Sequence, residues 1–145
     1  MLDEQLDKRN TMNILLVDDS RELIEVVEEV LVRMGHRIVR AYNGQEAYKH
    51  IEENEDLDLV ISDNQMPIMT GPELIMSLVE MKVPYPPIIL WSGNVHTIPS
   101  DISSYVFEIL PKGTDFDNIL NCVARIGLSK YSKIFIAGNL STTKF

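Results

Sequence analysis

Four short apolar runs in this chain each end in a polar residue. The runs end at Asp18-Asp19, at Asp63, at Ser92 and at Lys112. Short, nearly continuous apolar runs predict strands that are buried on both faces of a parallel sheet. In such a sheet the ligand site lies just beyond the carboxyl ends of the strands. We therefore expect three carboxylates, a hydroxyl and an ammonium to meet in one crevice.

Helical patterns alternate with these runs, so the sequence predicts five β/α units and an α/β, doubly wound five-stranded parallel sheet with helices on both faces. The expected strands span about 13–18, 37–41, a run ending at 63, a run ending at 92, and 106–110. The expected helices span about 21–34, begin at the N-cap Asn43, begin at Gly71-Pro72, and run from a Thr114 cap to Gly127.

Apolar stripes predict which side chains face the core. Met34 closes the stripe of the first helix and Met81 closes that of the third. The segment 94–104 has a thin stripe, and only a short helix is expected there. His36 is expected at the surface, whereas the ring of Trp91 should point away from the crevice into packing against a helix.

Length and composition favour one domain without a membrane segment. We expect a leader or flexible N-terminus at 1–11, the domain at 12–127, and a C-terminal tail at 128–145 with no output domain. The acidic N-terminus lacks the apolar core of a signal peptide. The single cysteine, Cys122, indicates a reducing cytoplasm, and a net charge of −9 argues against direct binding of nucleic acid.

The three carboxylates predict a metal site. If Asp18, Asp19 and Asp63 lie at neighbouring strand ends, their mutual repulsion raises their pKa values or destabilises the fold. A hard divalent cation removes this conflict, and oxygen ligands suit Mg²⁺. A single aspartate at a strand end is as often a turn residue. The complete set, together with Lys112, favours the site.

Asp63 is the candidate nucleophile, because a carboxylate can accept a phosphoryl group as an acyl phosphate. Lys112 and Mg²⁺ would stabilise the charge on the transferred group. The Ser92 hydroxyl is placed to hydrogen-bond the attached phosphoryl group, and Gly93 leaves room for a donor.

With these residues, the chain resembles the receiver domain of two-component response regulators, of the chemotaxis-regulator type. That family has a flavodoxin-like fold with strand order 2-1-3-4-5. The resemblance covers about residues 12–127. The matching stretches are Ile14-Leu15-Leu16-Val17-Asp18-Asp19-Ser20, Asn43-Gly44-Gln45-Glu46-Ala47, Asp63-Asn64-Gln65-Met66-Pro67-Ile68-Met69-Thr70-Gly71, Ser92-Gly93 and Pro111-Lys112.

The resemblance implies a role for each matching position. Asp63 matches the phosphoacceptor, and Asp18 with Asp19 matches the acid pair, Asp19 being the expected direct metal ligand. The backbone carbonyl of Gln65 would complete the shell of Mg²⁺. Ser92 matches the residue that follows the phosphoryl group when the switch flips, and Lys112 matches the lysine that pairs with phosphate.

The implied function is a phospho-switch rather than a metabolic enzyme. A sensor histidine kinase or phosphotransfer protein would donate the phosphoryl group, and the domain would catalyse only its own phosphorylation and dephosphorylation. A downstream protein would bind the face formed by the family's fourth helix, fifth strand and fifth helix. No contact with a membrane is expected.

The sequence departs from the family near this output face. Ile109 occupies the position where the family usually has an aromatic switch residue, and Gly113 replaces the usual proline after the lysine. The segment between Ser92 and Lys112 is also slightly short. The phosphorylation chemistry is expected to be intact, while the output surface is unusual.

Two other functions share part of this pattern. An aspartate-nucleophile phosphohydrolase of haloacid-dehalogenase type would need an Asp-x-Asp pattern at the first strand, whereas Asp18 and Asp19 are adjacent. A phosphorylation-independent interaction module with the same fold would not need the full set of polar residues. Mg²⁺-dependent labelling separates this module from the switch.

Overall fold

The computed structural model describes residues 11–54, 56–113 and 115–139, with side chains up to Ser129. Its centre is a five-stranded sheet in the order β2-β1-β3-β4-β5, and every strand pair is parallel. This order confirms the predicted fold class. The strands are β1 (Asn13–Val17), β2 (Arg37–Ala41), β3 (Leu59–Ser62), β4 (Ile88–Ser92) and β5 (Glu108–Pro111).

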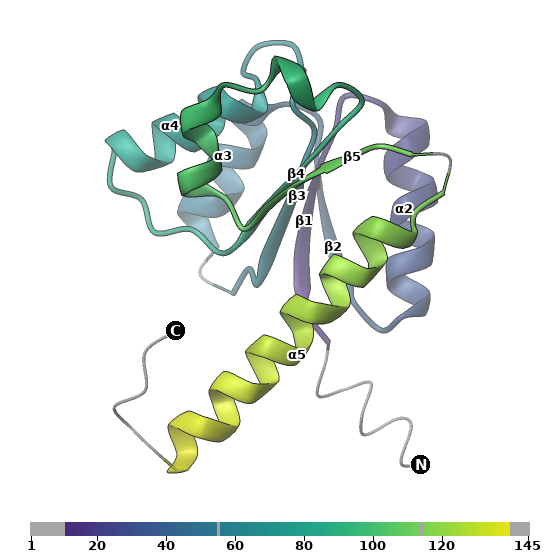
Figure 1. The fold of residues 1–145 in the computed structure, drawn as a ribbon, viewed down its shortest axis with the longest axis vertical. Helices are drawn as coiled ribbons and strands as arrows, with labels where there is room; N and C mark the ends of the chain where they lie inside the picture. The colour runs from purple at the N-terminus through teal and green to yellow at the C-terminus, as the bar shows by residue number, and fades with distance from the viewer. Residues whose placement is uncertain (1–10, 55, 114, 140–145) are drawn as a thin grey trace.

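Helices cover both faces of the sheet, as Figure 1 shows. Helices α2 and α5 lie on one face, and α3 and α4 lie on the other. Among the described helices, none is long and apolar enough to cross a membrane. The helices are α2 (Arg21–Arg33), α3 (Gly44–Glu53), α4 (Gly71–Glu80) and α5 (Asp117–Asn139), with two 3₁₀ helices, η1 (Val95–Thr97) and η2 (Ser100–Tyr105), between β4 and β5.

The central strands are buried on both faces, which explains their continuous apolar runs. In β1, Leu15 and Val17 pack in the core under α3 and α4. Ile14 and Leu16 pack in the second core under α2 and α5. This alternation follows from the two-residue period of a strand. The two cores hold the strand ends, and therefore the candidate site, in fixed register.

Side-chain caps begin the helices where the sequence predicts starts. Asn43 Oδ1 accepts from the backbone N–H of Glu46 at the start of α3. The helix α4 begins at Gly71-Pro72 as expected, and it also carries a capping box between Thr70 and Glu73 that was not predicted. Each cap satisfies backbone donors that the first helical turn leaves free.

Two methionines expected in the core are exposed. Met34 and Met81 are the C-cap residues of α2 and α4, and their exposed fractions are 38% and 68%. Both lie one position beyond the last residue of their helix. The buried stripe of α2 is instead Ile24, Val27 and Leu31.

The expected end of the last helix at Gly127 is wrong, because α5 continues to Asn139. Gly127 and its neighbour Ile126 are both buried, so this part of α5 packs against the rest of the domain. A glycine inside a helix costs about 1 kcal/mol relative to alanine, which is too little to end a well-packed helix. The beginning of the expected tail is thus helical.

Other local expectations need correction. His36 is buried, and its Nδ1 accepts from the backbone N–H of Met12, so an imidazole satisfies an amide at the start of β1. The strand β5 is shifted by two residues at its start relative to 106–110, because Val106 packs on the core before the ladder begins. The expected Thr114 cap lies outside the described residues.

Candidate functional site

Backbone hydrogen bonds continue beyond the strand ends and fix the site residues. The amide of Asp63 donates to Val17 O over 2.8 Å, which places the end of β3 beside the end of β1. The amide of Lys112 donates to Ser92 O over 2.7 Å, which places the end of β5 beside that of β4. All of the predicted site residues therefore lie at one edge of the sheet.

The three aspartates form the predicted acidic cluster. Asp18 is buried, Asp63 is half-buried and Asp19 is exposed, and one carboxylate oxygen from each lies within 4.8 Å of the others. This is a set of hard carboxylate oxygen donors, which suits Mg²⁺ better than a soft metal. Gln65 lines the same crevice with Asp63. The residues present thus fit the ion that the sequence predicts.

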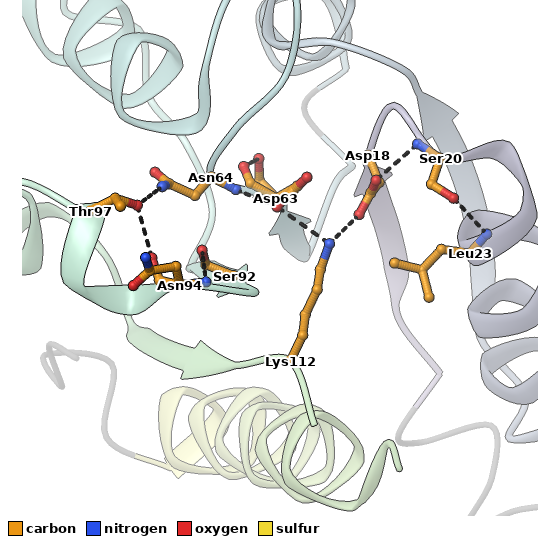
Figure 2. A network of polar contacts seen from close by, with 10 residues as sticks. Asp18, Ser20, Leu23, Asp63, Asn64, Ser92, Asn94, Thr97 and Lys112 are labelled. Atoms are coloured by element: carbon orange, nitrogen blue, oxygen red, sulfur yellow. Dashed lines mark hydrogen bonds and ion pairs between the residues drawn. The ribbon is translucent and has the colours of Figure 1, made fainter. Parts of the chain in front are cut away.

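Lys112 lies inside this cluster rather than beside it. Its Nζ is 2.8 Å from Asp18 Oδ2 and 3.3 Å from Asp63 Oδ1. The sequence predicts a lysine that pairs with phosphate, but it does not predict the ion pair with Asp18. In this structure the ammonium supplies positive charge that offsets the two carboxylates, as Figure 2 shows.

The environment of Asp63 makes ionisation of its carboxyl less favourable than in water. Burial raises the pKa of this carboxyl above its ordinary value, and the negative charge of Asp18 raises the pKa further. Lys112 and the backbone N–H of Asn64 act in the opposite direction, because they favour the carboxylate. An additional cation at the cluster would therefore favour the ionised form of Asp63.

The Ser92 hydroxyl lies on the other side of the crevice, which Asp63, Ser92 and Lys112 line together. Ser92 Oγ accepts from the backbone N–H of Asn94 over 3.1 Å. A neighbouring bond joins Asn64 Nδ2 to Thr97 Oγ1 over 2.9 Å. The sequence does not predict this second bond. The only signal for it was a polar residue directly after Asp63.

Trp91 forms a wall beside the lysine. Its ring makes an edge contact with Phe116 at a centroid distance of 5.7 Å, which agrees with the predicted packing near a helix. The ring is nevertheless not remote from the site, because Lys112 Nζ lies 5.5 Å from its centroid. An aromatic face at this distance attracts an ammonium. Trp91 therefore helps to hold the cation that faces Asp63.

The open parallel sheet, with acidic, hydroxyl and ammonium groups at its carboxyl edge, places the chain among doubly wound α/β domains with a site at that edge. Residues 14–124 match the family model of the response regulator receiver domain. The chain therefore belongs to the response regulator receiver domain family, whose members are signalling switches in two-component systems.

Curated relatives agree with this family. A chemotaxis protein CheY homolog of Campylobacter jejuni is 37% identical over 81 residues, which cover 54% of this chain and 62% of that protein. The CAI-1 autoinducer sensor kinase/phosphatase CqsS of Vibrio cholerae is 31% identical over 120 residues, which cover 80% of this chain and 17% of that protein. The chain thus spans less than two thirds of these relatives.

Solved structures share the fold. The response regulator TrrA of Thermotoga maritima, determined in complex with Mg²⁺ and BeF, is 31% identical with a TM-score of 0.71. The similarity covers 79% of this chain and 98% of that protein. CheY in the CheX–CheY–BeF₃–Mg²⁺ complex of Borrelia burgdorferi is 24% identical with a TM-score of 0.68, covering 79% of this chain and 88% of that one.

Proposed function

We propose that this domain is a phosphorylatable switch in which Asp63 accepts a phosphoryl group from a phosphohistidine on a sensor histidine kinase or phosphotransfer protein. The observation that carries the proposal is the position of Lys112 Nζ, which contacts both Asp18 and Asp63 inside the acidic cluster. The relative solved with Mg²⁺ and BeF supports the same site chemistry.

The proposed transfer is an in-line displacement at phosphorus. An Asp63 carboxylate oxygen bonds to phosphorus as the bond to the donor nitrogen breaks, and the electron pair stays on the departing imidazole. Lys112 moves its ammonium from Asp18 toward the incoming phosphoryl oxygens, and the Ser92 hydroxyl donates to one of them. Both groups stabilise the negative charge of the phosphoryl oxygens, which enters the site with the donor.

Mg²⁺ would be held by Asp18, Asp19, Asp63 and the backbone carbonyl of Gln65, and it would offset charge on the phosphoryl oxygens. Loss of the phosphoryl group to water completes the cycle. The domain thus catalyses only its own phosphorylation and dephosphorylation.

Phosphorylation would shift an equilibrium between two arrangements of the loops beside the site. In this chain η1 and η2 stand between β4 and β5, where the resemblance placed the fourth helix. We propose that the face formed by η2, β5 and α5 binds the downstream protein. No direct contact with nucleic acid or a membrane is proposed, and the single cysteine favours the reducing cytoplasm.

Intact mass spectrometry after incubation with acetyl phosphate and Mg²⁺ tests this function. The wild-type protein should gain one phosphoryl group, and Asp63→Asn should gain none. Asp101→Asn removes an exposed carboxylate in η2 and is the matched control, which should label like the wild type. Equal labelling of wild type and Asp63→Asn would eliminate Asp63 as the acceptor. A wild type that stays unlabelled with and without Mg²⁺ would favour the phosphorylation-independent module.

A further inference from the structure

Asn64 is a buried polar residue directly after the proposed phosphoacceptor, with an exposed fraction of 3%. Its backbone N–H donates to Asp63 Oδ1 over 2.8 Å, and its carbonyl accepts from the amide of Gly71 over 2.9 Å. Its side-chain Nδ2 donates to Thr97 Oγ1 over 2.9 Å. One residue therefore ties Asp63 to the start of α4 and to η1.

The bond to Thr97 continues back to Ser92. Thr97 Oγ1 donates to the carbonyl of Asn94 over 2.8 Å, and the amide of Asn94 donates to Ser92 Oγ over 3.1 Å. Figure 2 shows these contacts around one side of the crevice. The hydrogen bonds thus connect the carboxylate of Asp63 to the hydroxyl of Ser92 from two separate strand ends.

Besides these bonds, the segment that follows Ser92 is fixed by hydrogen bonds within itself and by the packing of Ile98 on the core. Gly93, Asn94, His96 and Thr97 are exposed, and a fully buried side chain appears only at Ile102 in η2. Segments with little buried apolar surface open readily. The burial of an amide costs free energy unless the amide is hydrogen-bonded, so the bond to Thr97 offsets the cost of burying the Asn64 side chain. The same bond holds Thr97 in place.

We propose that Asn64 is a positioning residue, whose side chain holds residues 93–98 in place so that Ser92 faces Asp63 before a phosphoryl group arrives. We name the Asn64–Thr97 bond the latch. The proposal rests on the proposed function and adds to it a residue that acts through the Ser92 loop. A loop that is already ordered loses less entropy when a phosphoryl group or its mimic binds.

A double-mutant cycle on the latch tests this role, with beryllofluoride and Mg²⁺ as the probe. Asn64→Leu removes the donor at similar volume, and Thr97→Val removes the acceptor. Each single variant should bind beryllofluoride about fivefold more weakly, the value expected for one lost hydrogen bond. The double variant should be no weaker than either single variant. Thr97→Ser keeps the hydroxyl and should restore the affinity.

Amide hydrogen exchange in the free protein is the second measurement. Asn64→Leu and Thr97→Val should each raise exchange at residues 94–98, while exchange in β1 and β3 stays as in the wild type. Thr97 is exposed, so the Thr97→Val variant remains a test if Asn64→Leu does not fold.

The outcomes separate the latch from the proposed function. Additive losses in the double variant, or wild-type exchange at 94–98 in both single variants, would overturn the latch. A wild type that neither binds beryllofluoride nor accepts a phosphoryl group would overturn the proposed function. In that case the exchange comparison alone would still decide whether Asn64 holds the loop.

Discussion

Lys112 Nζ lies 2.8 Å from Asp18 Oδ2 and 3.3 Å from Asp63 Oδ1, so one ammonium from the end of β5 bridges carboxylates from β1 and β3. The side chains are largely shielded, with exposed fractions of 23% for Lys112, 8% for Asp18 and 13% for Asp63. The same ammonium is proposed to stabilise the phosphoryl group. Its bond to Asp18 must therefore be exchanged for a new one during the reaction.

Removal of this ammonium should destabilise the metal-free protein. Lys112→Met leaves two carboxylates without their shared counter-charge, and we expect the free energy of unfolding to fall by about 2 kcal/mol, below the full cost of a deeply buried pair because water reaches the site. Urea denaturation without metal measures the loss, and Mg²⁺ should recover part of it. Lys49→Met, at an exposed position of α3, is the control. Equal stability of the two variants would contradict the bridging role.

Mg²⁺ should stabilise the folded protein, because it relieves repulsion among Asp18, Asp19 and Asp63 and binds only the folded state. At a concentration about 100 times the dissociation constant the expected gain is about 2.7 kcal/mol, seen as a rise of several degrees in the thermal midpoint. Asp19→Asn should lose this response. Glu25→Gln, which removes an exposed acid of α2, should keep it. A full response in Asp19→Asn would place the cation elsewhere.

Asp63 should make the metal-free protein less stable as pH rises. Its pKa is raised by burial and by Asp18, so the folded state binds this proton more tightly than the unfolded state does. The resulting stabilisation is present below the unfolded pKa and is lost as pH rises through the folded pKa. Asp63→Asn removes this titration, so it should be more stable than the wild type near pH 7, and the difference should shrink toward about pH 4. Denaturation across this range measures it, and a less stable Asp63→Asn at neutral pH would contradict the argument.

Gly71 should be intolerant of a side chain. A Cβ at this position would lie 2.5 Å from the backbone oxygen of Asp63, which cannot move without moving the proposed phosphoacceptor. We expect Gly71→Ala to cost about 1–3 kcal/mol of stability, as overpacking does, and to slow labelling by acetyl phosphate. Gly93 is the matched control, because a Cβ there meets nothing within 4 Å. Stability and labelling equal to those of Gly93→Ala would show that the loop relaxes freely.

The parallel sheet was predictable because its strands are continuous apolar runs with polar residues at their carboxyl ends, whereas the strand order was implied by the resemblance to the receiver family. The meeting of Asp18, Asp63 and Lys112 followed from that topology alone. Hydrogen bonds between particular side chains were harder to predict from the sequence. The Asn64–Thr97 bond joins residues 33 positions apart, and Thr97 lies in a segment without a clear hydrophobic pattern. No spacing of residue types in the sequence predicts this bond. The predicted helix end at Gly127 was wrong for a different reason. Burial of this face of α5 outweighs the small loss of helix propensity at a glycine.

Activation should proceed without a rotamer change at the usual aromatic position in β5. Ile109 occupies that position, is half-buried and packs against the core under α3 and α4. Isoleucine is branched at Cβ and stiff at χ1, so it cannot swing a ring between buried and exposed states. Coupling must then pass mainly through the Ser92 loop and the 3₁₀ helices that follow it. Beryllofluoride with Mg²⁺ should change amide exchange most in residues 92–105 and little in β5.

The variant Ile109→Val tests the same point, because it keeps a β-branched side chain while removing one methyl group. The exchange response of residues 92–105 to beryllofluoride should survive this change, with a stability loss of about 1 kcal/mol from the smaller side chain. Thr97→Val, in contrast, should raise exchange in residues 94–98 of the free protein. A response concentrated in residues 108–111, or strong protection of 94–104 that beryllofluoride and Mg²⁺ leave unchanged, would show that the signal takes another route.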